Sequence, residues 1–267
     1  MTDHNGSVSM TNRDRTLLLV VGLGAGFLSG VFGVGGGILV VPGLMIFVKM
    51  EQRRAHGTSL AAVLPIAIAS LVTYWAHDHV DWPVALWLSI GALGGAFVGA
   101  SLLAIISKRN LALVFAIVLA IVGIRLFFTV NGDGRSDITI LIALAYVVVG
   151  LATGALSGLL GIGGGAIMVP IMAVFFGIPS VVAKGTSLAV IIPTALMGTL
   201  RNRSKANVDL TAAVVVGITG VVMAVVGAWV SARMSDTLSN ALFAVLLIAV
   251  AARMLRQAWK ETAKAGG

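Results

Sequence analysis

The chain has 267 residues, of which 58% are hydrophobic and only 10% are charged, and its mean hydropathy is +1.05. A soluble domain carries about 25% charged residues, so this composition excludes a soluble protein and indicates one that crosses a membrane several times. The net charge is +8, but the basic residues form short clusters between apolar runs, a pattern of membrane loops rather than of nucleic-acid binding. The absence of cysteine excludes disulfides, thiolate metal sites and cysteine nucleophiles.

The polar first fifteen residues end in Arg13 and Arg15, directly before the first apolar run. No short apolar core with a small-residue cleavage site follows, so we expect residues 1–15 to be a retained cytoplasmic tail and not a signal peptide. The apolar segments that follow form two sets of five: 17–33, 38–48, 56–76, 83–106 and 111–130, then 140–160, 166–176, 184–200, 210–232 and 239–259. A spanning helix needs about 20 apolar residues, so the first two segments of each set are interpreted as short. They form either two short, tilted helices or a re-entrant hairpin.

The two sets are copies of one another. Residues 22–42 recur as residues 150–170, at an offset of 128 positions (150 − 22 = 128). Each copy is a glycine-rich apolar run that is broken by three consecutive glycines and resumes up to a proline. We therefore divide the chain into a tail, a first transmembrane repeat, a linker, a second transmembrane repeat and a C-terminal tail. Their predicted bounds are 1–15, 16–130, 131–138, 139–260 and 261–267.

Loop charges relate the two repeats to the membrane. In the first repeat, residues 53–54 and 108–109 are basic, whereas loop 77–81 has no lysine or arginine. The second repeat has the opposite pattern, with basic residues in 201–205 and none in 235–237. The positive-inside rule thus predicts an all-α, multi-pass inner (plasma) membrane protein of two inverted-topology repeats, with four to five helical segments each and both termini cytoplasmic.

The triple glycines are the first candidate site. Small residues let membrane helices approach closely, so packing alone is one explanation. The alternative is that Ile38–Val48 and Ala166–Phe176 are half-helices whose N-terminal amides attract an anion. The glycines assigned to this site are Gly33, Gly35, Gly36 and Gly37, with Gly161, Gly163, Gly164 and Gly165. Their spacing matches neither a P-loop nor a dinucleotide-binding motif.

A second repeated motif occupies residues 55–61 and 183–189 and contains Gly-Thr-Ser-Leu in both copies. Its hydroxyl groups either cap the helices that follow or line a polar path and donate hydrogen bonds to an oxyanion. The predicted substrate-binding hydroxyls are Ser29, Thr58, Ser59, Ser157, Thr186 and Ser187. His56 and Lys184 occupy equivalent positions, and we expect them to attract or gate anions at opposite mouths of the path. Asp81 and Asp209, also equivalent, are predicted to cap the helices that they precede.

No acidic residue lies within an apolar segment, although proton- or sodium-coupled carriers commonly place one there. The predicted path is therefore neutral to positive. With no acid, cysteine or histidine-rich ligand set in the spans, we predict no enzyme activity, no catalytic residue, no metal and no cofactor.

At these motifs the sequence resembles the TauE/SafE family of sulfite exporter-like membrane proteins. The residues that carry the resemblance are Gly33, Gly35–Gly37, Val41 and Pro42, their counterparts Gly161, Gly163–Gly165, Val169 and Pro170, the two Gly-Thr-Ser-Leu stretches, and Gly123–Leu126. The second copy has Ala252 before its closing Arg253 and so departs from the Gly-x-Arg of the first. The resemblance implies transport of small sulfur-containing or carboxylate anions.

Taken together, the sequence predicts a transporter that exports sulfite, a sulfonate or another small oxyanion, with its site between the repeats. Its partners would be the small anion and the lipid bilayer. The alternative from another class is a membrane scaffold or assembly subunit, in which the glycines serve packing only.

Overall fold

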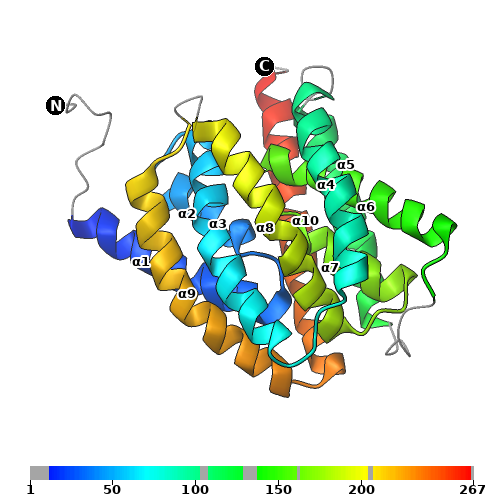
Figure 1. Cartoon of the computed structure of the whole chain (residues 1–267). Helices are drawn as coiled ribbons and strands as arrows, with labels where there is room; N and C mark the ends of the chain where they lie inside the picture. The colour runs from blue at the N-terminus through cyan, green and yellow to red at the C-terminus, as the bar shows by residue number, and fades with distance from the viewer. Residues whose placement is uncertain (1–11, 103–107, 129–136, 161–162, 204–206, 266–267) are drawn as a thin grey trace.

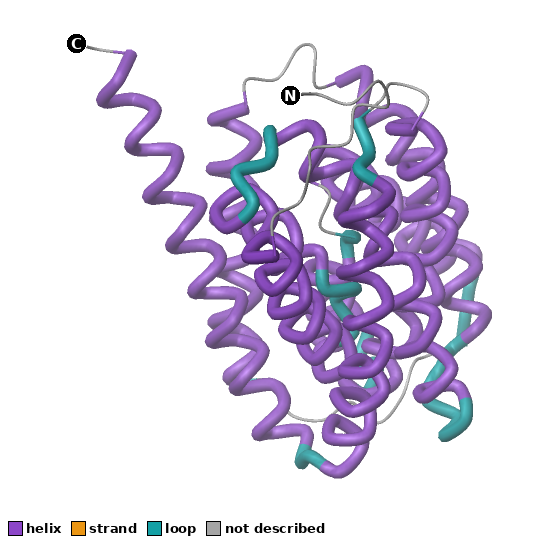
Figure 2. Tube along the Cα trace, turned by 90° about the vertical axis from the view of Figure 1, so that its left-hand side faces the viewer, coloured by secondary structure: helices purple, strands orange, loops and turns teal. Residues whose placement is uncertain are grey.

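The computed structural model describes residues 12–102, 108–128, 137–160, 163–203 and 207–265. Every regular element in these residues is an α-helix, which confirms the predicted all-α fold (Figure 2). The helices are α1 (Asn12–Phe32), α2 (Gly37–Phe47), α3 (Gln52–Trp75), α4 (Trp82–Leu102), α5 (Lys108–Phe127), α6 (Ile140–Leu160), α7 (Gly165–Phe175), α8 (Ser180–Arg203), α9 (Leu210–Arg233) and α10 (Asp236–Ala265).

Six of these helices are long and apolar enough to cross a membrane: α1, α3, α8, α9 and most of α6 and α10. We expected the first two segments of each set to be short. This expectation is wrong for the first segment of each set, because the corresponding helices α1 and α6 have 21 residues each. In α1 the helix extends backwards from the apolar run through the polar residues Asn12–Thr16, and polar side chains at a helix end can reach the membrane interface. Only α2 and α7, with 11 residues each, are short.

Each helix of the first half begins 128 positions before its counterpart in the second half, as in α2 and α7 (165 − 37 = 128). The packing follows the same correspondence. Helix α1 packs mainly on α9, and α4 packs mainly on α6, so the first helix of each half lies against the fourth helix of the other (Figure 1). Helices α3 and α8 pack on each other, as do α5 and α10. The two halves are therefore interlocked, and each cluster of buried apolar residues contains side chains from both.

Helices α3 and α8 run in opposite directions. Gly57, near the start of α3, lies against Asn202 and the carbonyl of Asn207 at the end of α8. Gly185, near the start of α8, lies against Tyr74 and the carbonyl of His79 at the end of α3. Val63 and Ile191, which are equivalent positions, are both fully buried between these contacts. The equivalent helices α3 and α8 thus form the antiparallel centre of the bundle. At its edge, the C-terminal part of α10 extends beyond the other helices (Figure 2).

Candidate anion site at the glycine breaks

Both triple glycines interrupt the chain between two helices. Gly36 and Gly164 have φ angles of 76° and 75°, and they immediately precede α2 and α7. Side chains other than glycine rarely adopt this left-handed conformation, which explains the need for glycine here. The predicted half-helices begin and end within one residue of α2 and α7, so their position and length are confirmed. Gly161 lies outside the described residues.

The first backbone amides of α2 and α7 have no acceptor in the hydrogen-bond pattern of their helix. The carbonyl of Gly36 accepts from Leu39 at 3.0 Å and from Val40 at 3.2 Å, and that of Gly164 accepts from Ile167 and Met168 in the same way. Within the described residues, the amides of Gly37 and Ile38 make no backbone hydrogen bond. Free amides at a helix N-terminus carry a partial positive charge.

The two breaks lie against each other at the centre of the bundle. Gly165 packs so closely on the first break that a Cβ atom there would lie 2.6 Å from the carbonyl oxygen of Gly33. Gly35 contacts the side chains of Val63 and Ile191, and Gly163 lies near the same two residues. Residues 31–38 are all buried. The structure therefore brings the two sets of predicted glycines together in a closed arrangement.

The six predicted hydroxyls are all buried, with at most 3% of each residue exposed. Thr58, Ser59, Thr186 and Ser187 do not cap helices, because α3 and α8 begin six or more residues before them. Ser187 donates to the carbonyl of Gly33 at 2.6 Å and so ties α8 to the first break. The Oγ atoms of Ser29 and Ser70 lie 3.4 Å apart.

Thr58 and Thr186 form two equivalent contacts with the loops before α9 and α4. The Thr58 hydroxyl accepts from the amide of Asp209, and the Thr186 hydroxyl accepts from the amide of Asp81, both at 2.9 Å. Each aspartate then caps the helix that follows, since Asp209 accepts from the amide of Ala212 at 3.0 Å and Asp81 from that of Val84 at 3.2 Å. The predicted capping role of both aspartates is confirmed. The threonines therefore also fix the loops at the two ends of the bundle.

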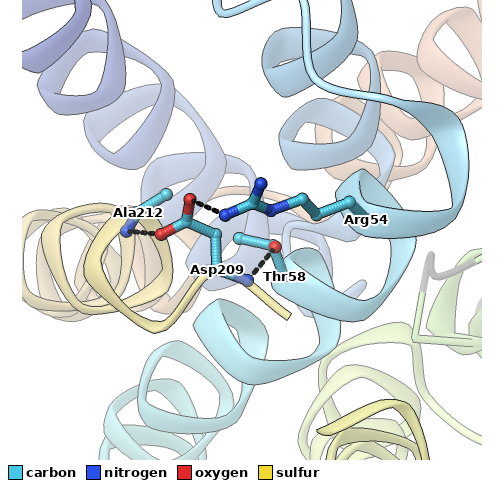
Figure 3. Close-up of polar contacts among 4 residues, drawn as sticks. All are labelled: Arg54, Thr58, Asp209 and Ala212. Carbon is cyan, nitrogen blue, oxygen red and sulfur yellow. Dashed lines mark hydrogen bonds and ion pairs between the residues drawn. The ribbon is translucent and has the colours of Figure 1, made fainter. Parts of the chain in front are cut away.

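An ion pair accompanies the contact between Thr58 and Asp209. Arg54 donates to the second carboxylate oxygen of Asp209 at 2.8 Å (Figure 3). The position equivalent to Arg54 in the second half is Val182, so the ion pair breaks the correspondence between the halves. Sequence reasoning used Arg54 only as a loop charge, because nothing in the sequence relates it to a residue 155 positions away.

Lys184 differs from the exposed position that we expected at a mouth, because the residue is only 2% exposed. Its ammonium group donates to Ser231 Oγ at 2.9 Å and also bonds Ser239 Oγ. These serines belong to α9 and α10, which close over the start of α8. His56, the equivalent residue, is half-buried in α3. Sequence reasoning missed Ser231 and Ser239 because neither belongs to a repeated motif.

A separate apolar pocket of about 380 Å³ lies at the start of α6, beside Trp87 of α4. Its other lining residues are Ile138, Thr139, Ile140, Ala143 and Leu144. It is remote from the glycine breaks and offers little polar chemistry. No group of three or more histidine or acidic side chains that would hold a metal occurs in the described residues.

Comparison with known proteins decides the family. The sequence profile of the family described as "Sulfite exporter TauE/SafE" matches residues 4–126 and 146–266. The chain belongs to the TauE/SafE family. The resemblance seen in the glycine and Gly-Thr-Ser-Leu motifs is thereby confirmed, and the all-helical bundle with six candidate spans is that of a multi-pass membrane protein.

Curated relatives cover most of the chain. A protein of Xylella fastidiosa (strain 9a5c), named "Probable membrane transporter protein", is 30% identical over 253 residues, which are 92% of this chain and 97% of the relative. The "Probable membrane transporter protein YunE" of Bacillus subtilis (strain 168) is 29% identical and covers 72% of this chain and 80% of its own length. A third, from Methanocaldococcus jannaschii, is 31% identical over 200 residues, or 72% of this chain and 73% of the relative. No solved structure matches the chain.

Proposed function

We propose that this TauE/SafE protein is a membrane transporter that exports small sulfur-containing anions such as sulfite or a sulfonate. The family description names sulfite export, and the curated relatives are named probable membrane transporters. The observation that carries the proposal is the meeting of the two glycine breaks in the centre of the bundle. Each break starts a short helix, and helix N-termini favour bound anions.

The proposed site lies between two inverted repeats. The antiparallel packing of α3 and α8 supports this arrangement, and so does the exchange of α1 and α4 contacts between the halves. Transporters built in this way bind their substrate near the membrane midplane and expose it to each side in turn. The closed packing at Gly33–Gly37 corresponds in this mechanism to an occluded state, and movement of one half against the other would open a path to either side.

The membrane potential supplies a driving force for export. An inside-negative potential favours the exit of a single negative charge by about 2.3 kcal/mol per 100 mV. The described acidic residues lie in loops, in the first turn of a helix or, for Glu261, near the end of α10 beyond its apolar part, so none provides a carboxylate in the middle of a span. In this mechanism the anion moves down the electrical gradient, and no acidic residue needs to carry a coupled proton.

Reconstituted vesicles test the proposal. Vesicles that contain the protein are loaded with sulfite, sulfate, methanesulfonate or acetate, and efflux is followed with and without an inside-negative potential. We expect sulfite or methanesulfonate efflux that exceeds that of protein-free vesicles and rises with the potential. Acetate efflux alone would favour the carboxylate alternative, and no efflux of any of these anions would favour the scaffold alternative. Gly94→Ala, where the added methyl group finds open space on α4, serves as a control for expression and reconstitution and should transport like the wild type.

The glycine breaks provide the corresponding variants. Gly36→Leu and Gly164→Leu should abolish efflux, because a side chain at either position is strained and would push the break away from the helix before it, α1 or α6. A Cβ atom at Gly36 would also lie 2.6 Å from the carbonyl of Ala25, so membrane insertion and monodispersity must be measured on the same samples. Full efflux by both variants at normal expression would remove the site from the breaks.

A further inference from the structure

The start of α8 contains a buried polar cluster that the repeated motifs do not explain. Lys184 Nζ donates to Ser231 Oγ of α9 at 2.9 Å and bonds Ser239 Oγ of α10. One turn earlier, Ser180 donates to Asn240 Oδ1 at 2.7 Å, which fixes the first turn of α10 against α8. The four serine and asparagine partners and the lysine are each at most 7% exposed. Three helices thus converge on one ammonium group.

The first half of the chain does not repeat this cluster. The positions equivalent to Lys184, Ser231 and Ser239 in the first half are His56, Leu103 and Leu111, and those equivalent to Ser180 and Asn240 are Gln52 and Ala112. The first half therefore uses mostly apolar residues at these positions, whereas the second half places a charge and hydroxyls there. A structural requirement common to both halves would not produce this difference.

The charge of the cluster is not balanced by a carboxylate. Within the described part of the chain, Lys184 forms no ion pair, and the ion pair found there joins Arg54 to Asp209 at the opposite end of α3 and α8. Asp236, in the first turn of α10, acts on Lys184 through its charge but makes no contact of ion-pair length with it. A buried ammonium that has only neutral hydrogen-bond partners is costly, and an anion beside it would remove that cost.

We propose that Lys184, Ser231 and Ser239 bind the transported oxyanion directly beside the first glycine break, where α8, α9 and α10 meet, so that the second half supplies the charged side of the site between the halves. This inference rests on the proposed function and assigns its substrate site. The ammonium group has three N–H bonds and uses two of them on the serines, so one remains for a ligand oxygen. Ser239 accepts from the lysine and keeps its own proton to donate to a second oxygen. The ligand class is therefore a small oxyanion with at least two oxygen atoms.

The cluster is linked to the glycine breaks on both sides. Ser187, one turn after Lys184, donates to the carbonyl of Gly33, and the backbone of Lys184 packs directly on Gly33. On the other side, Tyr74 lies near Ser231, and its hydroxyl donates to the carbonyl of Gly30 at 2.7 Å. An anion bound at Lys184 would therefore lie beside the end of α1 and the first break, and its arrival or departure would act on them directly.

Anion-dependent stabilisation tests this site without relying on transport. The purified protein in detergent is heated with sodium sulfite, sodium methanesulfonate, sodium acetate or sodium chloride at equal ionic strength. We expect sulfite or methanesulfonate to raise the unfolding temperature of the wild type above that in chloride. Lys184→Met, which removes an uncompensated buried charge, should unfold in chloride at the wild-type temperature or above it. It should lose the oxyanion-dependent rise at every ionic strength.

Further variants separate this role from simple packing. Ser239→Ala keeps the lysine and should weaken the affinity for sulfite by about tenfold, the effect of one lost hydrogen bond to a charged group. Thr237→Ala removes an exposed hydroxyl from the same turn of α10, and Arg233→Gln removes an exposed charge near Ser231, and both should bind sulfite like the wild type. If Lys184→Met does not fold, Ser239→Ala and Thr237→Ala still decide the question.

Several results would overturn the inference. The first is equal stabilisation of the wild type and Lys184→Met by an oxyanion, and the second is an unchanged affinity for sulfite in Ser239→Ala. The third is a difference in stabilisation between the wild type and Lys184→Met that disappears as the salt concentration rises. The fourth is a wild type that no oxyanion stabilises. Failure of the proposed function is distinct from each of these. A wild type that is stabilised by sulfite through Lys184 but does not move sulfite across vesicles would retain the site and contradict the transporter. Sulfite efflux that is unchanged in Lys184→Met would retain the transporter and contradict the site.

Discussion

Asp209 shows how a single side chain joins separate parts of the bundle. Its carboxylate caps α9 and pairs with Arg54 of α3, while its amide donates to Thr58 (Figure 3). The residue is 8% exposed, so these interactions are largely shielded from water. The start of α9 is thereby fixed to the start of α3, across the junction between the two halves.

Two substitutions at Asp209 should separate capping from charge. Asp209→Ala loses both, and we expect the free energy of unfolding to fall by about 1–3 kcal/mol. Asp209→Asn keeps an oxygen that can accept from Ala212, so its loss should be limited to the ion pair, at most about 1 kcal/mol because Arg54 is partly exposed. Reversible unfolding in detergent measures both. Equal stability of Asp209→Ala and the wild type would contradict the assigned contacts.

His79, in the loop between α3 and α4, makes stability depend on pH. Burial lowers the pKa of His79 from its ordinary value of 6.5, and the charge of His77 lowers it further, while Asp78 and Asp236 act in the opposite direction. As the pH falls, the imidazole of His79 takes up its proton in the unfolded chain before it does so in the folded protein. Above pH 6.5 the titration of His79 should therefore leave the stability unchanged. The stability should then fall as the pH is lowered from 6.5 to the pKa of the folded state.

The variant His79→Gln should remove this part of the pH dependence. Unfolding temperatures of the variant and the wild type are compared between neutral pH and mild acid, with the other histidines present in both proteins. We expect the difference between the two to change below pH 6.5, in favour of the variant. Parallel curves over the whole range would show that His79 titrates equally in the folded and unfolded chains.

At the scale of the helices, close packing depends on particular glycines. Helix α4 lies so near α6 that a Cβ atom at Gly95 would overlap the carbonyl of Leu151, whereas a Cβ atom at the adjacent Gly94 would meet nothing within 4 Å. Membrane helices use small residues for such close approaches. The packing of α4 on α6 is matched by the packing of the equivalent helices α9 and α1. Small residues are therefore needed at both of these contacts.

Adjacent alanine substitutions test this packing with a matched control. Gly95→Ala should lower the stability by about 1–3 kcal/mol, because α4 and α6 must move apart. Gly94→Ala should be neutral or stabilising by up to about 1 kcal/mol, since alanine favours the helix and finds open space. Thermal unfolding of the two variants provides the comparison. A larger loss for Gly94→Ala would contradict the packing of α4 on α6.

The sequence predicts helices and breaks better than it predicts contacts. Apolar runs and triple glycines locate α2 and α7 within one residue, because local backbone preference and hydropathy decide them. The length of α1 is not predicted, since its first turn consists of polar residues. The burial of Lys184 and its bonds to Ser231 and Ser239 are not predicted either, because they depend on how α9 and α10 pack on α8.

At the scale of the whole molecule, the equal spacing of the helices and the exchange of their contacts describe two copies of one unit. Helix α3 meets α8 in the opposite direction, and the breaks meet between them. The proposed path for the anion requires that these copies have opposite orientations in the membrane. This opposite orientation is the central claim of the proposed mechanism.

Cysteine labelling in intact cells tests that claim most directly, and the chain offers a background without cysteine. Single cysteines replace Arg53, Arg203 and His77, which are all exposed; His77 is chosen over Asp81 in the same loop because Asp81 caps α4. A membrane-impermeant maleimide should label position 77 in intact cells, and it should label positions 53 and 203 only after the cells are permeabilised. Labelling of positions 77 and 203 from the same side would contradict the inverted arrangement and the site between the two halves.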